Sequence, residues 1–129
     1  MKDSARKWLA YAEENLACAR LVLENGYLNA SLQNSQQAIE KALKALILEM
    51  DLEFRKTHSV SELTDILTAG SVEIGLTDDE KELLDSIYLP SKYPLGSALP
   101  DAEPDIVICE TCIRVAERVV TAVSSIFSG

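Results

Sequence analysis

The sequence predicts an all-α protein: an up-down antiparallel bundle of four to five helices, with a long proline-rich loop before the last helix. Two observations lead to this prediction. Apolar residues recur at intervals of three and four along most of the chain, which is the spacing of one buried helical face. All four prolines fall within residues 88–105, so the strongest helix breaker is absent elsewhere. A length of 129 residues suits one domain, residues 1–129.

The first two predicted helices are long and span residues 3–25 and 28–50. Apolar residues from Ala5 to Leu23 form one stripe on the first helix, and Gly26 follows it as a stop signal. The second contains QQAIEKALKALI, which is rich in strong helix formers. Its Glu40 and Lys44 stand one turn apart, in the order that favours an ion pair.

Two shorter helices are predicted next, after a loop at DLEFRKTH. Ser59 followed by Glu62 matches a capping box, which marks the start of the third helix. The fourth is predicted at LTDDEKELLDSIYL, where Thr77 can cap the helix and the acidic run suits its positive dipole end.

The last predicted helix runs from about Glu103 or Pro104 to Phe127, and it is apolar around much of its circumference. A helix that is apolar on two faces must bury both. One face can serve the internal core, and the other predicts a partner helix from a second copy of the chain. The sequence therefore predicts a homodimer.

Residues 88–105, YLPSKYPLGSALPDAEPD, are predicted to be a non-helical, proline-stiffened crossover. Connections longer than about 12 residues are uncommon in compact domains and are usually functional or disordered. In one interpretation, Lys92 and Tyr93 present a cation and a ring to a nucleotide or phosphate. In the other, Tyr88 and Tyr93 pack over the bundle and the loop only joins distant helix ends.

The composition and the N-terminal sequence predict the cellular compartment. No apolar run approaches the roughly 18 residues that span a bilayer, so no membrane association is predicted. The N-terminus lacks a signal core, and the three cysteines form no disulfide framework, so the cytoplasm is predicted.

Charge is spread unevenly along the chain. Residues 1–58 carry eight basic and eight acidic residues, whereas residues 59–129 carry four and thirteen and account for the whole net charge of −9. Because duplex binding requires a basic surface that neutralises phosphates, no duplex nucleic acid is predicted as a partner. The overall charge does not exclude a local basic site, and the acidic half suits a basic protein partner.

Few residues carry recognisable chemistry. His58, the only histidine, follows Arg55 and Lys56 and either acts as an acid–base or phosphate-binding group or makes a structural hydrogen bond. Cys109 and Cys112 form a C-x-x-C without the further ligands of a zinc site, so both are expected in the core and no metal is predicted. The chain has no phosphate-binding loop or dinucleotide fingerprint, so no cofactor is predicted either.

Four blocks, taken in order, resemble the HEPN domain, the nucleotide-binding family of higher eukaryotes and prokaryotes. They are the early tryptophan helix, GYLNASLQNSQQAIEKALKALIL, KTHSVSEL, and YLPSKYP followed by PDA. The resemblance implies an up-down bundle of about five helices and a homodimer. It also implies a partner, a minimal nucleotidyltransferase, in a toxin–antitoxin-like system.

Some members of that family are ribonucleases that use an arginine, four to six intervening residues and a histidine. Here Arg55 lies only three positions before His58, so the sequence predicts a non-catalytic protein. The resemblance does carry over Lys56 with His58, and Ser91–Pro94 with Lys92 where the family usually has arginine. The candidate nucleotide- or phosphate-binding residues are Arg55, Lys56, His58, Lys92 and Tyr93. Two alternatives stay open: a metal-independent ribonuclease toxin with a non-standard site at His58, and a purely structural dimerisation module.

Overall fold

Five α-helices make up the described part of the chain in the computed structural model, which covers residues 2–92 and 104–128 apart from the side chains of residues 89–92. They are α1 (Asp3–Glu24), α2 (Leu28–Glu49), α3 (Val60–Ala69), α4 (Asp78–Lys92) and α5 (Ile106–Ser128). The predicted all-α class is therefore confirmed. None of the helices within these ranges has the length and apolar character needed to cross a membrane.

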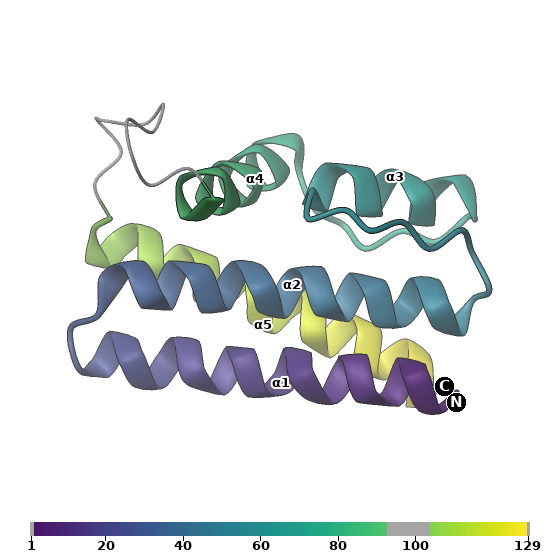
Figure 1. The fold of residues 1–129 in the computed structure, drawn as a ribbon, viewed down its shortest axis with the longest axis horizontal. Helices are drawn as coiled ribbons and strands as arrows, with labels where there is room; N and C mark the ends of the chain where they lie inside the picture. The colour runs from purple at the N-terminus through teal and green to yellow at the C-terminus, as the bar shows by residue number, and fades with distance from the viewer. Residues whose placement is uncertain (1, 93–103, 129) are drawn as a thin grey trace.

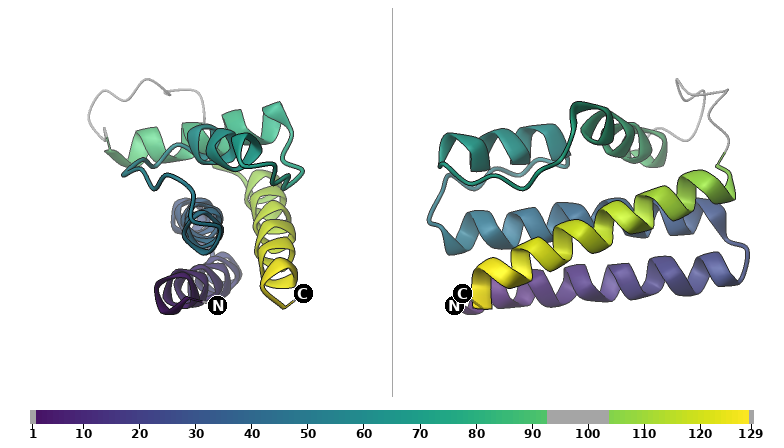
Figure 2. Two further views of the ribbon diagram at one scale, coloured as in Figure 1. Left: turned by 90° about the vertical axis from the view of Figure 1, so that its right-hand side faces the viewer. Right: turned by 180° about the vertical axis from the view of Figure 1, so that it is seen from behind.

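The three long helices form the body of the molecule, and the two short ones form a layer on top of it (Figures 1 and 2). α1 and α2 run antiparallel, and α5 crosses them obliquely (Figure 1). α3 and α4 lie on the opposite side of α2 from α1 (Figure 2). α2 is therefore the central helix, and it contacts both layers.

Small residues let α1 and α2 approach closely along their length. Ala5, Ala12 and Ala19 recur every seventh residue on α1 and are fully buried. The Ser31 hydroxyl on α2 donates to the Ala19 carbonyl at 3.0 Å. The chain reverses at Gly26, whose φ of 84° lies in the left-handed region, and the amides of residues 26 and 27 close the end of α1 onto its last carbonyls.

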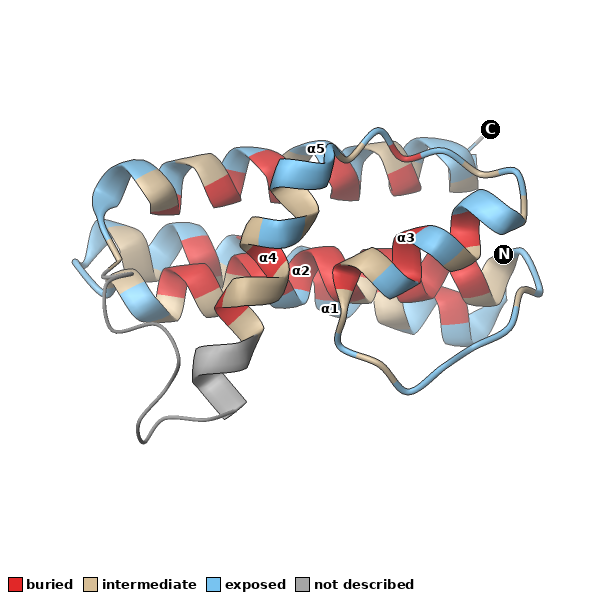
Figure 3. Cartoon of the chain, turned by 90° about the horizontal axis from the view of Figure 1, so that it is seen from above, coloured by how far each residue is buried: buried red, intermediate tan, exposed pale blue. Residues whose placement is uncertain are grey.

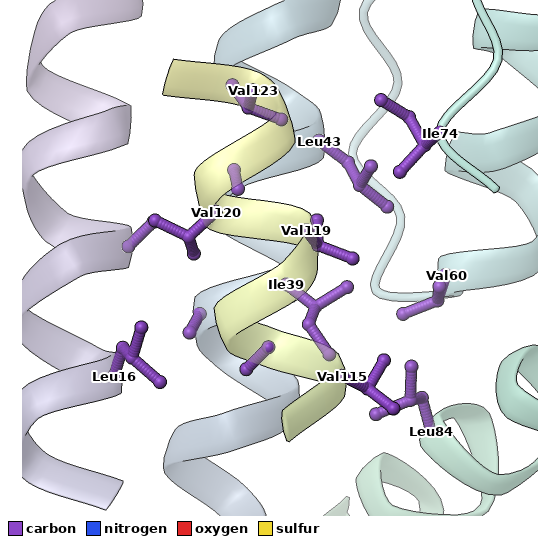
Figure 4. Packing of buried hydrophobic residues seen from close by; sticks show 14 of the residues in the cluster. Leu16, Ile39, Leu43, Val60, Ile74, Leu84, Val115, Val119, Val120 and Val123 are labelled. Carbon is purple, nitrogen blue, oxygen red and sulfur yellow. The ribbon is translucent and has the colours of Figure 1, made fainter. Parts of the chain in front are cut away.

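The core lies where α2 meets α5 and the short helices (Figures 3 and 4). Ile39 and Leu43 of α2 are fully buried, and Val119 and Val123 of α5 lie against the same cluster (Figure 4). Leu84 of α4 closes it on the side of the short helices, next to Val115 (Figure 4). The described residues thus share one hydrophobic core.

Most of the apolar circumference of α5 is buried within a single chain. Its buried residues are Cys109, Cys112, Ile113, Val115, Ala116, Val119, Val120 and Val123. Its exposed residues include the charged Glu110, Arg114 and Arg118 and also the apolar Ile106, Val107 and Ile126. α1 and α2 cover most of the apolar residues of α5, whereas Ile106, Val107 and Ile126 stay exposed, and a partner helix against them stays an expectation. The homodimer itself stays a prediction.

Side-chain caps start the helices where the sequence patterns indicate. Ser59 Oγ accepts a hydrogen bond from the Glu62 amide at 3.2 Å, and Thr77 and Glu80 form a reciprocal capping box of 2.9 and 3.1 Å. The last helix begins later than the predicted Glu103 or Pro104. Asp105 caps it, because its Oδ1 accepts from the Ile108 amide at 2.7 Å, so the helix proper starts at Ile106.

The prediction that the whole of residues 88–105 is non-helical was wrong at its start, since α4 continues through Tyr88 to Lys92. Pro90 lies within this last turn. A proline removes one backbone donor and disturbs the turn before it, but this cost is limited where the helix ends two residues later. The rest of the predicted proline-rich loop, from Tyr93 to Glu103, lies outside the described residues.

Candidate functional site

A buried ion pair on α2 forms the base of the candidate site. Lys44 Nζ lies 2.7 Å from Glu40 Oε1, and the two side chains are only 6% and 7% exposed. Lys and Glu are seldom buried so completely unless they are paired. The one-turn spacing predicted the pair, but it gave no sign that both charges lie inside the molecule.

His58 reaches this pair from the loop between α2 and α3. Its Nδ1 lies 2.8 Å from Glu40 Oε1, the oxygen that also accepts from Lys44. The Gln36 amide donates to Glu40 Oε2 at 3.2 Å and to the His58 carbonyl oxygen at 3.3 Å. Both carboxylate oxygens of Glu40 are therefore occupied, and Gln36 ties the loop backbone to the same network.

Besides the Nδ1 contact, one face of the His58 ring is covered, and the described residues leave about half of the side chain exposed. It stacks on Tyr88 of α4, with ring centroids 4.5 Å apart and an interplanar angle of 14°. The His58 side chain remains 51% exposed. No described residue supplies a hydrogen-bond partner for its Nε2. Lys92 ends α4 one helical turn beyond Tyr88.

Aromatic residues cover the other end of the ion pair. Lys44 Nζ lies 5.5 Å from the centroid of the Trp8 ring, a cation–π distance. Phe54, from the same loop as His58, packs against Trp8 with ring centroids 6.1 Å apart. The loop is thus anchored at Phe54 and at His58, which fixes where the histidine stands.

Arg55 is directed elsewhere, although it is only three positions from His58. Its Nε donates to Glu53 at 2.9 Å, and this hydrogen bond raises the pKa of the guanidinium. Arg55 also lines a hollow of about 330 Å³ on the α3 side, together with Glu62 and Asp65. The structure therefore does not bring Arg55 to the histidine.

Of the other candidate nucleotide-binding residues, only Lys56 has a side chain that the structure describes. Lys56 is exposed on the loop between Arg55 and His58. Lys92 is placed by its backbone only, and Tyr93 lies outside the described residues.

The two C-x-x-C thiols lie in the core, as expected. Cys109 and Cys112 are both fully buried. Burial raises the pKa of Cys112 to about 12 and also raises that of Cys109. Within residues 2–92 and 104–128, no group of three potential ligands is arranged to hold a metal ion.

Sequence reasoning missed Gln36, Glu40, Lys44 and Tyr88 as parts of the site. One signal was available: three polar residues recur every fourth position on α2, directly beside the buried positions Ile39 and Leu43. Polar residues at that spacing in a buried stripe indicate an internal network. The pairing with His58 and Tyr88 depends on tertiary packing, and no local pattern reports it.

The family model of the HEPN domain matches residues 5–126. The chain belongs to the HEPN family. Two solved structures are similar to this HEPN protein over nearly its whole length. The archaeal HEPN homologue ST0689 is 29% identical, with 97% of this chain and 98% of that chain covered and a TM-score of 0.72. TT1696 from Thermus thermophilus is 25% identical, with 96% and 98% covered and a TM-score of 0.75. No curated protein matches the sequence.

Proposed function

We propose that this HEPN protein binds a nucleotide at the surface formed by His58 and Tyr88 and does not cleave RNA. The observation that carries the proposal is the half-exposed His58 ring, which is fixed by Glu40 on its edge and by Tyr88 on one face. A ring held in this way needs no reorganisation when a ligand arrives, and such preorganisation favours binding.

The part of the His58 ring that the described residues leave exposed suits a nucleobase. Bases stack on aromatic side chains, histidine included, and each such contact contributes about 1–3 kcal/mol. Lys56 on the loop and Lys92 at the end of α4 are the cations that we assign to the phosphates. Lysine binds phosphate as a point charge rather than through a planar fork. The proposed site therefore combines a stacking ring with two lysines.

The absence of a suitable arginine supports a non-catalytic role. The ribonucleases of this family pair an arginine with the histidine, and such a guanidinium stabilises charge in the transition state. Arg55 is committed to Glu53, and Lys44 is buried and paired with Glu40. Neither is placed to serve a substrate at His58.

We further propose that the protein acts as a homodimer and as the partner of a minimal nucleotidyltransferase, in a toxin–antitoxin-like system. Membership of the HEPN family and the acidic half of the chain, residues 59–129, support this proposal. Light scattering should give twice the chain mass. Co-expression with a minimal nucleotidyltransferase should yield a complex that survives purification. A monomer and no complex would contradict this part.

Calorimetric titration with ATP tests the nucleotide site. The wild-type protein should give a saturable heat, and the Tyr88→Leu variant should bind about tenfold more weakly because the histidine loses its stacking support. Arg55→Ala is the matched control, since it changes the same loop on the side away from His58. Absence of heat with the wild type would refute nucleotide binding and leave a purely structural dimerisation module.

One observation favours the second candidate, a metal-independent ribonuclease centred on His58. A histidine whose Nδ1 is bonded to a carboxylate can act through Nε2 as a general base. RNA incubated with the protein and a chelator would then be cleaved, and His58→Ala would abolish the cleavage. Intact RNA with the wild-type protein would exclude this candidate.

A further inference from the structure

We propose that Glu40 is a positioning residue that holds His58 in the Nδ1–H tautomer, so that Nε2 accepts a hydrogen bond from a ribose hydroxyl of the bound nucleotide. This inference rests on the proposed nucleotide site and names the part of the nucleotide that His58 contacts. It assigns a role to Glu40, which the sequence patterns did not connect with the histidine.

The donors around Glu40 determine where the imidazole hydrogen lies. Lys44 donates to Oε1 at 2.7 Å and Gln36 donates to Oε2 at 3.2 Å, so the carboxylate acts as an acceptor on both oxygens. An ionised carboxylate has no hydrogen to donate. In its 2.8 Å contact with the same Oε1, His58 Nδ1 must therefore be the donor.

The geometry also prevents the ring from turning over. Gln36 holds the His58 carbonyl oxygen at 3.3 Å, which fixes the backbone relative to α2. Tyr88 covers one face of the ring at a centroid distance of 4.5 Å. A ring flip would break the Glu40 contact without offering Nδ1 another described partner. Nε2 is thus the nitrogen left for a ligand.

A neutral imidazole with hydrogen on Nδ1 presents Nε2 as an acceptor. Phosphate oxygens are acceptors as well, so they cannot bond to that nitrogen unless the ring is protonated. Ribose hydroxyls can donate to it. We place the base against the exposed part of the ring and its sugar at the ring edge, beside Nε2. In this neutral tautomer the sugar, and not the phosphate, is the partner of His58 Nε2.

Nitrogen NMR of the imidazole tests both halves of the inference, because His58 is the only histidine in the chain. In the free protein, Nδ1 should show the shift of a protonated nitrogen and Nε2 that of a bare one. At saturating concentrations, ATP should move the Nε2 resonance strongly, 2′,3′-dideoxy-ATP, which can still stack, should move it much less, and inorganic tripolyphosphate should leave it in place. Removing the hydroxyls should weaken binding by about tenfold, the effect of losing one hydrogen bond.

Several results would overturn the inference. Hydrogen on Nε2 with none on Nδ1 in the free protein would refute the positioning role of Glu40. An equal Nε2 shift with dideoxy-ATP or with tripolyphosphate would refute the ribose contact while leaving nucleotide binding intact. If ATP neither released heat nor moved the resonance, the ribose contact would fail together with the proposed function.

A pair of variants tests whether Glu40 is the cause. Glu40→Leu combined with Lys44→Met removes both charges and leaves Nδ1 without its acceptor. The hydrogen should then redistribute toward Nε2, and the preference for ATP over dideoxy-ATP should shrink. Gln37→Ala changes an exposed neighbour on α2 and should keep the wild-type spectrum. An unchanged tautomer in the folded double variant would contradict the role of Glu40.

Discussion

At the scale of single residues, the buried pair of Glu40 and Lys44 has the largest expected effect on stability. Lys44→Met leaves the Glu40 carboxylate buried without its counter-charge, so the free energy of unfolding should fall by about 3–5 kcal/mol. Chemical denaturation of the wild type and the variant measures this difference.

The matched control is the double variant Glu40→Leu/Lys44→Met. Replacing both members of a buried pair by apolar residues is often neutral or stabilising, so the double variant should recover most of the lost stability. If the single and double variants were equally unstable, the carboxylate would not be the source of the cost.

The cysteines provide a second test at this scale. Cys109 and Cys112 are fully buried and have raised pKa values, whereas Cys18 is partly exposed. Because the thiolate is the reactive form, alkylation of the native protein at neutral pH should modify Cys18 well before the other two. Mass spectrometry of the digested protein would show the order. Early modification of Cys112 would mean that the end of α5 opens readily.

At the scale of helices, Asp85 joins α4 to the start of α3. Its carboxylate accepts from the Val60 amide at 2.6 Å, from the Ser59 hydroxyl at 3.1 Å and from the Ser61 amide at 3.3 Å. These groups form the positive end of α3, where a negative charge is favourable. The carboxylate therefore caps α3 from a neighbouring helix.

Asp85→Ala should lower the free energy of unfolding by about 2 kcal/mol, because an N-terminal cap and a charged hydrogen-bond acceptor are lost together. Glu82→Ala, at an exposed position one turn earlier on α4, should change stability little. Thermal unfolding of the two variants gives the comparison, and similar losses in both would contradict the capping role.

The contact between α4 and α5 gives a prediction about pH. Arg118 donates to Glu80 at 2.5 Å, and this hydrogen bond lowers the pKa of Glu80 below its ordinary value of 4.5. A depressed carboxyl pKa stabilises the folded state above that ordinary value. The stabilisation is lost as the pH falls through the lowered pKa.

Glu80→Gln should therefore be less stable than the wild type at neutral pH, and the difference should shrink in acid. Unfolding curves measured at neutral pH and well below pH 4.5 would show this convergence. A gap that stayed constant, or widened, on acidification would contradict the assigned cause.

At the scale of the whole molecule, the helix periodicity predicted the fold well because most contacts along each helix are local. Ser59 and Thr77 could also be predicted as helix caps, since a capping residue and its partner lie three positions apart. Which helices cover which side of α5 was not predicted, because a single sequence does not report it. The helical turn that contains Pro90 was missed because the prolines were taken to end the helix before residue 90. A proline in the last turn disturbs the helix little.

Only part of the candidate site could be predicted, because some of its contacts depend on tertiary packing and not on local sequence. His58 and Lys56 could be found from the order of residues, but the Glu40–His58 and His58–Tyr88 contacts join segments far apart in sequence. α2 carries both the apolar core and the polar network, on adjoining strips of one helix. Its burial is therefore what connects the stability of the fold with the geometry of the histidine.

The most direct test of the proposed nucleotide site maps an ATP titration onto the amide and histidine-ring resonances of the isotope-labelled protein. We predict that the largest shifts fall at His58, Gln36 and Tyr88, which surround the proposed site, and that Glu62 and Asp65 across the loop stay unchanged. Shifts concentrated in the hollow lined by Arg55, or no shift at His58 at saturating ATP, would contradict the proposed site.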